Sequence, residues 1–413
     1  MILEEIGKRA KEAARRLALC TTDEKNRALC MSAQALLDET PYILAENEKD
    51  IASAKANGMS ASLLDRLRLT EARIAGMAKG LREVAELPDP VGRVLAEDVR
   101  PNGLRLTKVA VPIGVIAVIY EARPNVTADA AALCLKSGNA VILRGGKEAI
   151  RSNMAVATVM NRALSAAGLP QGCMQFVEST DRAVTQELMK LNRYVDLLIP
   201  RGGAGLIRAV VDNATVPVIE TGAGTCHVYV DRCADIDMAV RIIDNAKTSR
   251  PSVCNAAECM LVHRDIAATA LPRIAARLRE KGVEIHASPD ALTLVPQALP
   301  ATDEDWGKEY GDYIIAARIV DSEDEAIDYI TRYGTGHSEC IVTEDEAAAA
   351  KFLREVDAAA VYHNASTRFT DGGEFGMGAE IGISTQKLHA RGPLGLAELT
   401  SMKYLVRGNG QIR

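Results

Sequence analysis

The chain has 413 residues, more than one ordinary hydrophobic core holds, so we expect two or three domains. Its net charge of −6 gives no reason to expect nucleic acid or an anionic membrane as a partner. The nine cysteines include neither a C-x-x-C pair nor a Cys/His cluster of zinc-finger spacing, which favours a reduced, cytoplasmic protein without a structural metal. The longest apolar run, residues 109–120, is too short to span a bilayer.

Taken in chain order, the first ninety residues have the apolar spacing of helices. At 87–93 this pattern stops, and residues 94–111 resemble a hairpin of two strands that turns at Pro101, Asn102 and Gly103. An ordinary edge hairpin and an arm that packs on a neighbouring subunit fit this pattern equally well.

From residue 113 apolar strands alternate with helices, and a second such series begins with a strand predicted at 216–220 and ends with one at 358–364. Near-continuous apolar strands joined by helices are typical of parallel sheets covered on both faces. We therefore predict an α/β fold with a doubly wound domain and a second α/β domain, followed by a last strand within 400–413.

A single cysteine, Cys254, lies in the polar stretch SRPSVCNAAE between a predicted helix and a predicted strand. Loops held by rigid elements often carry reactive groups, and Arg250 is near enough in sequence to lower a thiol pKa if it points inward. The alternative is an inert buried thiol, which is the commoner fate of a free cysteine.

Two glycine-rich turns follow predicted strands. In RGGKEA, Arg144 and Lys147 offer cationic donors suited to a ribose 2′-phosphate, which favours NADP over NAD. In PRGGAGL, Gly202 and Gly203 would let an anionic ligand approach the N-terminus of a helix. Neither turn has P-loop or G-x-G-x-x-G spacing, so each can also be an ordinary turn.

Further candidates come from two polar segments. Asn125 in YEARPNVT is either a helix cap or an oxyanion donor that acts with the backbone amide of Cys254. Segment 363–396 is rich in glycine and polar donors, and it is either a solvated loop or the mouth of a substrate site. Its candidates for holding an amino-acid head group or a phosphate are Asn364, Ser366, Arg368 and Arg391.

The order EARPN, RGGKEA, PRGGAG, VIETGAG, SRPSVCNAAE resembles the aldehyde dehydrogenase superfamily over nearly the whole chain. Asn125, Glu220 and Cys254 match the asparagine, glutamate and cysteine of that superfamily. The resemblance implies a Rossmann-type cofactor domain, a catalytic domain and a β-hairpin oligomerisation arm. The corresponding ranges are 1–92 with 111–224, then 225–399, and 93–110 with 400–413.

The segments RPN, PRGG, HNASTRFTDGG and STQKLHARGP resemble a branch of that superfamily that reduces an acyl phosphate. This implies NADPH-dependent reduction of L-glutamate 5-phosphate to L-glutamate 5-semialdehyde, with release of phosphate from a cysteine thioester, in proline biosynthesis. Glu309 resembles the family acid near the nicotinamide ribose, with Lys308 as the alternative. No water is activated in this direction, so Glu220 is expected to have a minor, cofactor-side role.

The resemblance also implies a homo-oligomer in which the hairpin and the terminal strand pair across subunits, and it allows an association with glutamate 5-kinase. Two other functions remain open. A hydrolytic aldehyde dehydrogenase would need Glu220 as a working base, and a catalytically silent binding protein would not need the intact Cys254 and Asn125.

Overall fold

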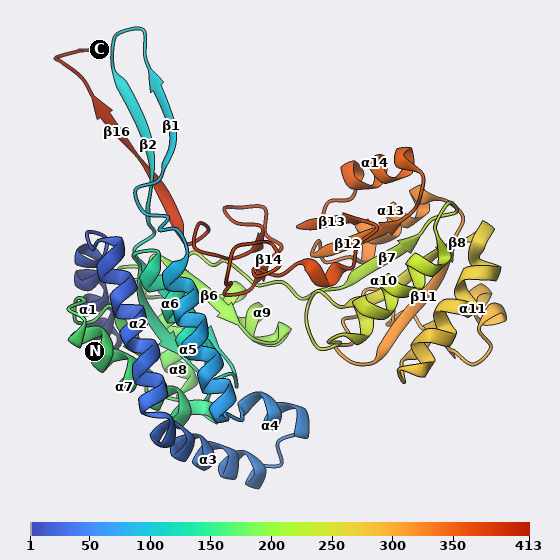
Figure 1. The fold of residues 1–413 in the computed structure, drawn as a ribbon, viewed down its shortest axis with the longest axis horizontal. Coiled ribbons are helices and arrows are strands. Elements are labelled where there is room, and N and C mark those ends of the chain that lie inside the picture. Colours follow the sequence, from blue (N-terminus) through green and yellow to red (C-terminus); the bar gives the residue numbers. More distant parts are fainter. Residues whose placement is uncertain (1) are drawn as a thin grey trace. The chain divides into compact units, whose positions relative to one another are not determined.

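A computed structural model describes residues 2–413, and their contacts divide the chain into two compact units (Figure 1). Unit 1 comprises Met1–Thr221, Gly376–Gly382 and Leu394–Arg413, and unit 2 comprises Gly222–Phe375 and Ile383–Pro393. No helix among residues 2–413 has the length and apolar character needed to cross a membrane. The division into a cofactor domain, a catalytic domain and an arm stays a prediction.

Unit 1 begins with the helical region that the sequence predicted. Its helices are α1 (Ile2–Leu17), α2 (Thr22–Asp38), α3 (Thr40–Ala56), α4 (Ala61–Leu67), α5 (Glu71–Glu86), α6 (Asn125–Lys136), α7 (Ile150–Ala166), α8 (Arg182–Met189), α9 (Ala204–Asn213) and the 3₁₀ turn η1 (Lys147–Ala149). Its strands are β1 (Val94–Val99), β2 (Arg105–Pro112), β3 (Val115–Tyr120), β4 (Ala140–Arg144), β5 (Met174–Phe176), β6 (Leu197–Arg201) and β16 (Thr400–Arg407).

The parallel sheet of unit 1 has the strand order β5-β4-β3-β6. Every residue of β3 is buried, and alternate residues Val115, Ala117 and Ile119 share one apolar cluster with side chains of α1, α8 and α9. Successive strand residues point to opposite faces, so the other residues of β3 face helices on the second side. The sheet is therefore covered on both faces, as predicted.

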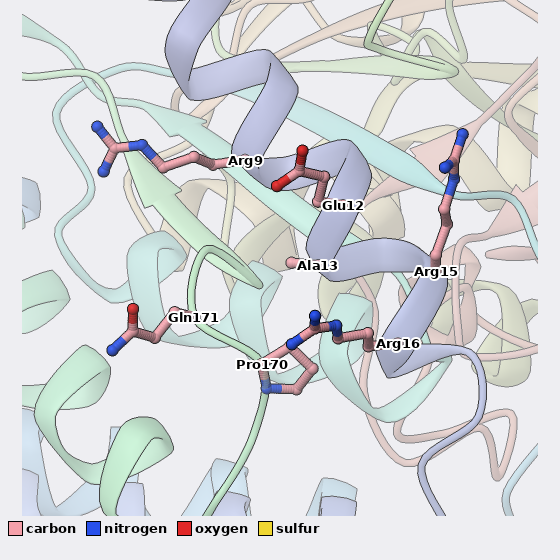
Figure 2. Close-up of a pocket in the computed structure, with 7 residues that line it drawn as sticks. All are labelled: Arg9, Glu12, Ala13, Arg15, Arg16, Pro170 and Gln171. Atoms are coloured by element: carbon pink, nitrogen blue, oxygen red, sulfur yellow. The ribbon is translucent and has the colours of Figure 1, made fainter.

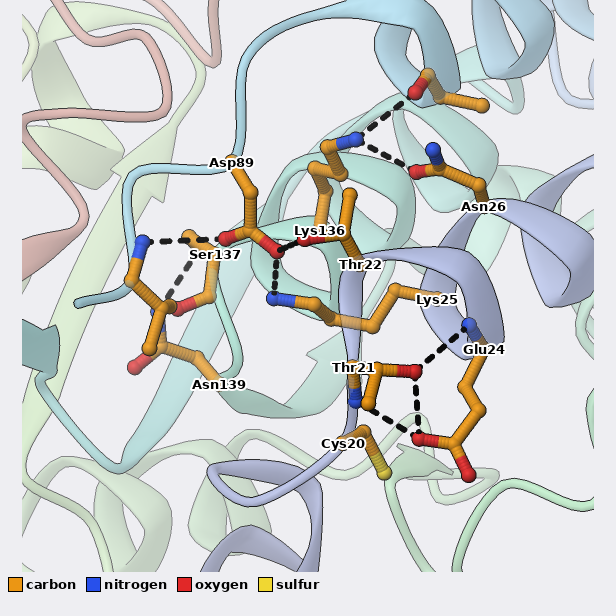
Figure 3. A network of polar contacts seen from close by, with 12 residues as sticks. Cys20, Thr21, Thr22, Glu24, Lys25, Asn26, Asp89, Lys136, Ser137 and Asn139 are labelled. Carbon is orange, nitrogen blue, oxygen red and sulfur yellow. Dashed lines mark hydrogen bonds and ion pairs between the residues drawn. The ribbon is translucent and has the colours of Figure 1, made fainter. Parts of the chain in front are cut away.

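A buried polar network fixes the turn that leads from the helices of unit 1 into the hairpin (Figure 3). Lys25, which is 1% exposed, forms an ion pair with Asp89 at 2.5 Å, and Asp89 also accepts from Thr22 at 2.8 Å. Lys136 donates to Asn26 at 2.5 Å and to the carbonyl of Ala85 at 2.7 Å. Buried lysines are tolerated because each is paired, so the network joins α2 and α6 to residues 85–89.

The predicted hairpin is present as β1 and β2, and β16 pairs antiparallel with β2 along its whole length, from Thr400 opposite Pro112 to Arg407 opposite Arg105. In Figure 1 these strands project away from the parallel sheet of unit 1. The hairpin and the terminal strand thus pair with each other within one chain. Pairing across subunits is a separate prediction, which is taken up below.

Unit 2 holds the second parallel sheet, with the strand order β10-β9-β11-β8-β7-β12-β13. Its strands are β7 (Cys226–Val230), β8 (Ala257–His263), β9 (Glu284–Ala287), β10 (Leu299–Pro300), β11 (Ile314–Val320), β12 (Ser338–Val342) and β13 (Ala360–His363), with a small antiparallel pair β14 (Ile383–Ser384) and β15 (Gly392–Pro393). Its helices are α10 (Ile236–Thr248), α11 (Arg264–Glu280), α12 (Pro289–Leu294), α13 (Glu323–Tyr333), α14 (Glu346–Glu355) and the 3₁₀ turn η2 (Thr367–Phe369).

Two apolar clusters lie on the two faces of this sheet. Val228, Met260 and Ala317 pack with α10 to α12, whereas the alternate residues Tyr229 and Leu261 pack with α13 and α14. The predicted α/β fold with parallel sheets is confirmed. The strand predicted at 216–220 is wrong, because the structure has there only an isolated bridge between Val218 and Leu198.

Candidate active site

Cys254 is half-buried in the loop between α10 and β8, at the amino end of β8. The loop consists of turns and bends, and within it the amide of Ala256 donates to the carbonyl of Val253 at 3.0 Å. Arg250 is exposed in the same loop. The predicted placement of this cysteine on a connection between rigid elements is therefore present in unit 2.

The carbonyl of Cys254 faces the start of β7. Cys226 Sγ donates to this oxygen at 3.2 Å, and a Cβ built on Gly224 would lie 1.5 Å from it. Burial raises the pKa of the Cys226 thiol well above its usual value, so this thiol stays protonated and remains a donor. Cys226 thus supports the loop and is a poor competitor as nucleophile.

Glu309 reaches the same segment, because its Oε1 accepts from the backbone amide of Gly224 at 3.2 Å. Partial burial raises the pKa of the Glu309 carboxyl group. Its neighbour Lys308 instead places its ammonium 5.2 Å from the centre of the Tyr310 ring. Of the two residues that the resemblance offered, Glu309 is the one that contacts the segment beside Cys254.

Segment 366–370 meets the Cys254 loop from another direction. Ser366 is buried and caps η2, where its hydroxyl accepts from the amide of Arg368 at 3.3 Å. The Arg368 guanidinium donates to Ser249 Oγ at 3.0 Å and also to Asn255 Oδ1. Asn255 and Ser249 were not predicted as site residues, and only the adjacency of Asn255 to Cys254 pointed to it.

Asn364 and Arg391 are engaged elsewhere in unit 2. Asn364 has a left-handed backbone with φ of 56°, and its amide group bonds to the backbone of Thr343, accepting at 3.0 Å and donating at 2.9 Å. Arg391 Nη1 forms an ion pair with Asp357 at 2.7 Å. Both side chains therefore hold the fold in this conformation, and their substrate roles stay predictions.

In the sheet of unit 1, β3 and β6 are neighbours. After β3 the chain continues to β4 on one side, and after β6 it continues on the other side, so their carboxyl ends form a switch point in the strand order. Ligands of open α/β sheets bind at such a switch point. Here the Oε2 atom of Glu121 accepts from the amide of Gly203 at 2.9 Å, and a Cβ on Gly202 would lie 2.7 Å from the same carboxylate. The Gly203 amide, which the sequence analysis assigned to an anionic ligand, thus donates to the Glu121 carboxylate of the same chain.

Arg144 and Lys147 follow β4 in unit 1. Arg144 donates to the carbonyls of Gly145 at 3.0 Å and Thr180 at 3.3 Å, and its Nε is buried with no hydrogen-bond partner among the described residues. Lys147 is exposed in η1. Glu220 is half-buried in the irregular stretch that follows α9.

Asn125 is the first residue of α6, and the N-cap position belongs to Pro124, which makes no side-chain cap hydrogen bond. Of the two alternatives for Asn125, the helix cap is therefore excluded, and the oxyanion role stays a prediction. Its Nδ2 donates to Asp129 one turn later at 2.8 Å. Burial raises the pKa of Asp129 to about 6, against the lowering effect of the hydrogen bond from Asn125 and the charge of Arg201.

A depression of 590 Å³ lies in unit 1 between α1 and the turn before β5 (Figure 2). Its polar lining is Arg9, Glu12, Arg15, Arg16 and Gln171. None of the predicted site residues lines it, so it does not alter the assignment of the candidate site.

A model of the aldehyde dehydrogenase family matches residues 3–297 of the chain. Gamma-glutamyl phosphate reductase of Moorella thermoacetica is 60% identical over 98% of this chain and 97% of that protein, and that of Carboxydothermus hydrogenoformans is 59% identical over 99% and 98%. The crystal structure of gamma-glutamyl phosphate reductase from Thermotoga maritima superposes with a TM-score of 0.98 at 51% identity, covering 100% of this chain and 99% of that one.

The chain therefore belongs to the aldehyde dehydrogenase family and, within it, to the branch of the gamma-glutamyl phosphate reductases. Members of the family use nicotinamide cofactors.

Proposed function

We propose that the chain reduces L-glutamate 5-phosphate to L-glutamate 5-semialdehyde with NADPH and releases phosphate, a step of proline biosynthesis. The observation that carries the proposal is a half-buried cysteine on a supported loop, in a chain about as long as its gamma-glutamyl phosphate reductase relatives and 60% identical to one of them. The reaction type follows from a thiol nucleophile and a phosphate leaving group.

Cys254 acts as the nucleophile. Its thiolate attacks the acyl carbon, the bond from that carbon to the phosphate oxygen breaks, and phosphate departs with the bonding electron pair to leave a thioester on the sulfur. Hydride addition to the thioester carbon and cleavage of the carbon–sulfur bond then free the aldehyde and restore the thiolate. We retain Asn125 as an oxyanion donor, supported by its exposed position at the start of α6 and by Asp129, which accepts from the side-chain amide.

The residues after β4 fit a phosphorylated nucleotide. The Arg144 Nε is a buried donor with no partner among residues 2–413, and the Lys147 ammonium is exposed nearby in the sequence. Cationic donors of this kind suit a 2′-phosphate, which supports NADPH over NADH. When bound, the nicotinamide supplies the hydride. Glu309 and Glu220 are proposed to contribute to the cofactor side, with Glu220 in a minor role.

The decisive experiment is the reverse assay. With L-glutamate 5-semialdehyde as substrate, NADP⁺ reduction should require added phosphate or arsenate and should exceed NAD⁺ reduction. Phosphate-independent turnover to free glutamate would instead identify a hydrolytic aldehyde dehydrogenase with Glu220 as its base.

Cys254→Ala should abolish this activity and leave nucleotide binding by fluorescence nearly unchanged. Cys233→Ala is the matched control, because Cys233 is exposed and lies after β7, outside the Cys254 loop. Retained activity in Cys254→Ala would remove this cysteine from the mechanism. If the parent protein binds nucleotide but does not convert L-glutamate 5-semialdehyde, the alternative of a catalytically silent binding protein is supported.

We also propose a cytoplasmic homo-oligomer assembled through the β1-β2-β16 sheet. Every residue of β1 is exposed, and so are the residues of β16 after Thr400. They include the large apolar side chains Val99, Tyr404 and Val406. An association with glutamate 5-kinase is retained as a proposal, and co-sedimentation of the two purified proteins tests it.

A further inference from the structure

The Cys254 loop begins and ends at a buried ion pair. Lys247, at the end of α10, and Glu258, at the start of β8, lie 2.6 Å apart, and both side chains are 0% exposed. Separating such a pair would leave two buried charges unpaired, which is costly. The pair joins the two ends of the loop, and the residues between them, 249–256, form turns and bends.

Segment 367–370 contacts the loop through Asn255, the residue after the nucleophile. Asn255 is 3% exposed, and its carbonyl accepts from Thr367 Oγ1 at 2.7 Å. Its Nδ2 donates to the carbonyl of Thr370 at 2.9 Å and to that of Arg368 at 3.3 Å. The backbone and the side chain of Asn255 are therefore both held by one short segment, more than a hundred residues away in the sequence.

Arg368 completes the support with its guanidinium group. Nε donates to Ser249 Oγ at 3.0 Å and Nη1 donates to Asn255 Oδ1, so one planar group bridges the loop from before Cys254 to after it. Burial lowers the pKa of Arg368, and the positive charge of Arg250 lowers it further, yet an arginine stays protonated in proteins. A lysine has a single nitrogen on a flexible stem and cannot reproduce this fork.

We propose that Arg368 and Asn255 are positioning residues, which hold the Cys254 loop in the conformation from which the sulfur attacks. Arg368 therefore acts mainly through Asn255 and Ser249 and not as the ligand of the substrate phosphate. The expected effect on turnover rests on the proposed function. The expected effect on the conformation of the Cys254 loop does not depend on that function.

The test replaces Arg368 by Lys, which keeps the charge and removes the bridge. A misplaced nucleophile loses turnover, so kcat of the phosphate-dependent reverse reaction should fall about 10- to 100-fold. The KM values for phosphate and semialdehyde should change less than about twofold, because ground-state binding is intact. Hydrogen–deuterium exchange of amides within 250–256 should quicken about tenfold, in line with the loss of charge-assisted hydrogen bonds.

Arg264→Lys is the matched control. Arg264 lies on α11 in the same unit and bonds to Asp290 and Asp321, away from the loop, so its replacement should leave kcat and the exchange of 250–256 as in the parent. Thr367→Val, nearly isosteric, removes only the bond to the carbonyl of Asn255 and should shift both readouts in the same direction as Arg368→Lys, by less.

A rise in KM for phosphate at unchanged kcat, with unchanged exchange in 250–256, would overturn the proposal and make Arg368 a substrate ligand. Should Arg368→Lys fail to fold by circular dichroism, Thr367→Val decides alone: parent-like kcat and exchange would overturn the proposal. If the parent shows no phosphate-dependent activity, the proposed function fails, and the exchange experiment still decides whether the bridge holds the loop.

Discussion

Gly224 is the residue at which the smallest change would disturb the nucleophile most directly. A methyl group there would lie 1.5 Å from the carbonyl oxygen of Cys254 and 2.4 Å from its carbonyl carbon. Backbone atoms cannot move aside without shifting the loop, and the same carbonyl also accepts from Cys226. The glycine is thus required by close approach of two backbone segments.

We predict that Gly224→Ala lowers the free energy of unfolding by about 2–4 kcal/mol, as overpacking against backbone does, and lowers kcat about a hundredfold or more. Urea denaturation and the phosphate-dependent assay measure the two effects. Gly76→Ala on α5 is the control, because nothing lies within 4 Å of its new Cβ. It should gain about 0.5–1 kcal/mol of stability, since alanine is the better helix residue. Parent-like kinetics in Gly224→Ala would contradict the close approach.

Asp129 makes the stability of the fold depend on pH. Its folded-state pKa is raised to about 6, whereas an unfolded aspartate has a pKa of about 3.9. Between these values the folded chain binds the proton more tightly than the unfolded chain, so this group stabilises the fold at low pH, and that contribution is lost as pH rises from about 4 to about 6.

Asp129→Asn keeps an acceptor for Asn125 but cannot titrate. Between pH 4.5 and pH 6.5 the parent should lose about 1 kcal/mol of its free energy of unfolding through Asp129, and the variant should not show this loss. The loss is smaller than the full pKa shift implies, because the Asp129 side chain is partly exposed. Chemical denaturation at the two pH values measures the difference. The same pH dependence in both proteins would rule out Asp129 as its source.

Among the elements, α9 begins at the predicted cofactor turn, and its N-terminus already holds a negative charge. The Glu121 carboxylate accepts from the Gly203 amide, an interaction worth about 0.3–1 kcal/mol at a helix N-terminus. A cofactor phosphate would compete for that amide and would be repelled by the carboxylate.

We therefore predict that Glu121→Gln binds NADPH severalfold more tightly than the parent in a fluorescence titration, while stability falls by about 0.5 kcal/mol. Asp345→Asn is the control, because this carboxylate likewise accepts from a backbone amide at a helix start, that of Ala347 at 2.9 Å, but belongs to α14 of unit 2. It should lose stability without a change in NADPH affinity. Equal or weaker NADPH binding by Glu121→Gln would show that the phosphate does not meet this amide.

At the scale of the whole molecule, the β1-β2-β16 sheet leaves apolar side chains in water. Val99 is 65% exposed, Tyr404 58% and Val406 55%, and a subunit contact would bury exposed apolar side chains of this kind. Tyr404 and Val406 are two residues apart on β16 and hence share a face.

We predict that the double change Tyr404→Glu and Val406→Glu lowers the oligomeric mass measured by light scattering, because charges on an apolar interface are buried at a cost of several kcal/mol. Leu19→Glu is the control, since Leu19 is 84% exposed beyond the end of α1, outside this sheet. An unchanged mass in the double variant would exclude the sheet as the subunit contact.

The sequence by itself determined the local elements, the α/β class and the family. Periodicity and turn residues are local signals, and they also placed Cys254 on a loop between a helix and a strand. The motifs that resemble the aldehyde dehydrogenase superfamily correctly predicted the family and its gamma-glutamyl phosphate reductase branch. Where the local signal was weak, at 216–220, the predicted strand was wrong.

Only the tertiary structure decided which side chains form hydrogen bonds with which partners. It joined Arg368 to Asn255, placed Glu121 on the amide of Gly203, and committed Asn364 to the backbone of Thr343. Each of these contacts closes a long stretch of chain, and its free energy depends on three-dimensional distances that no short window of residues encodes. The residue types could therefore show that Arg368 and Asn125 were able to bind a ligand, but not which group each side chain actually meets.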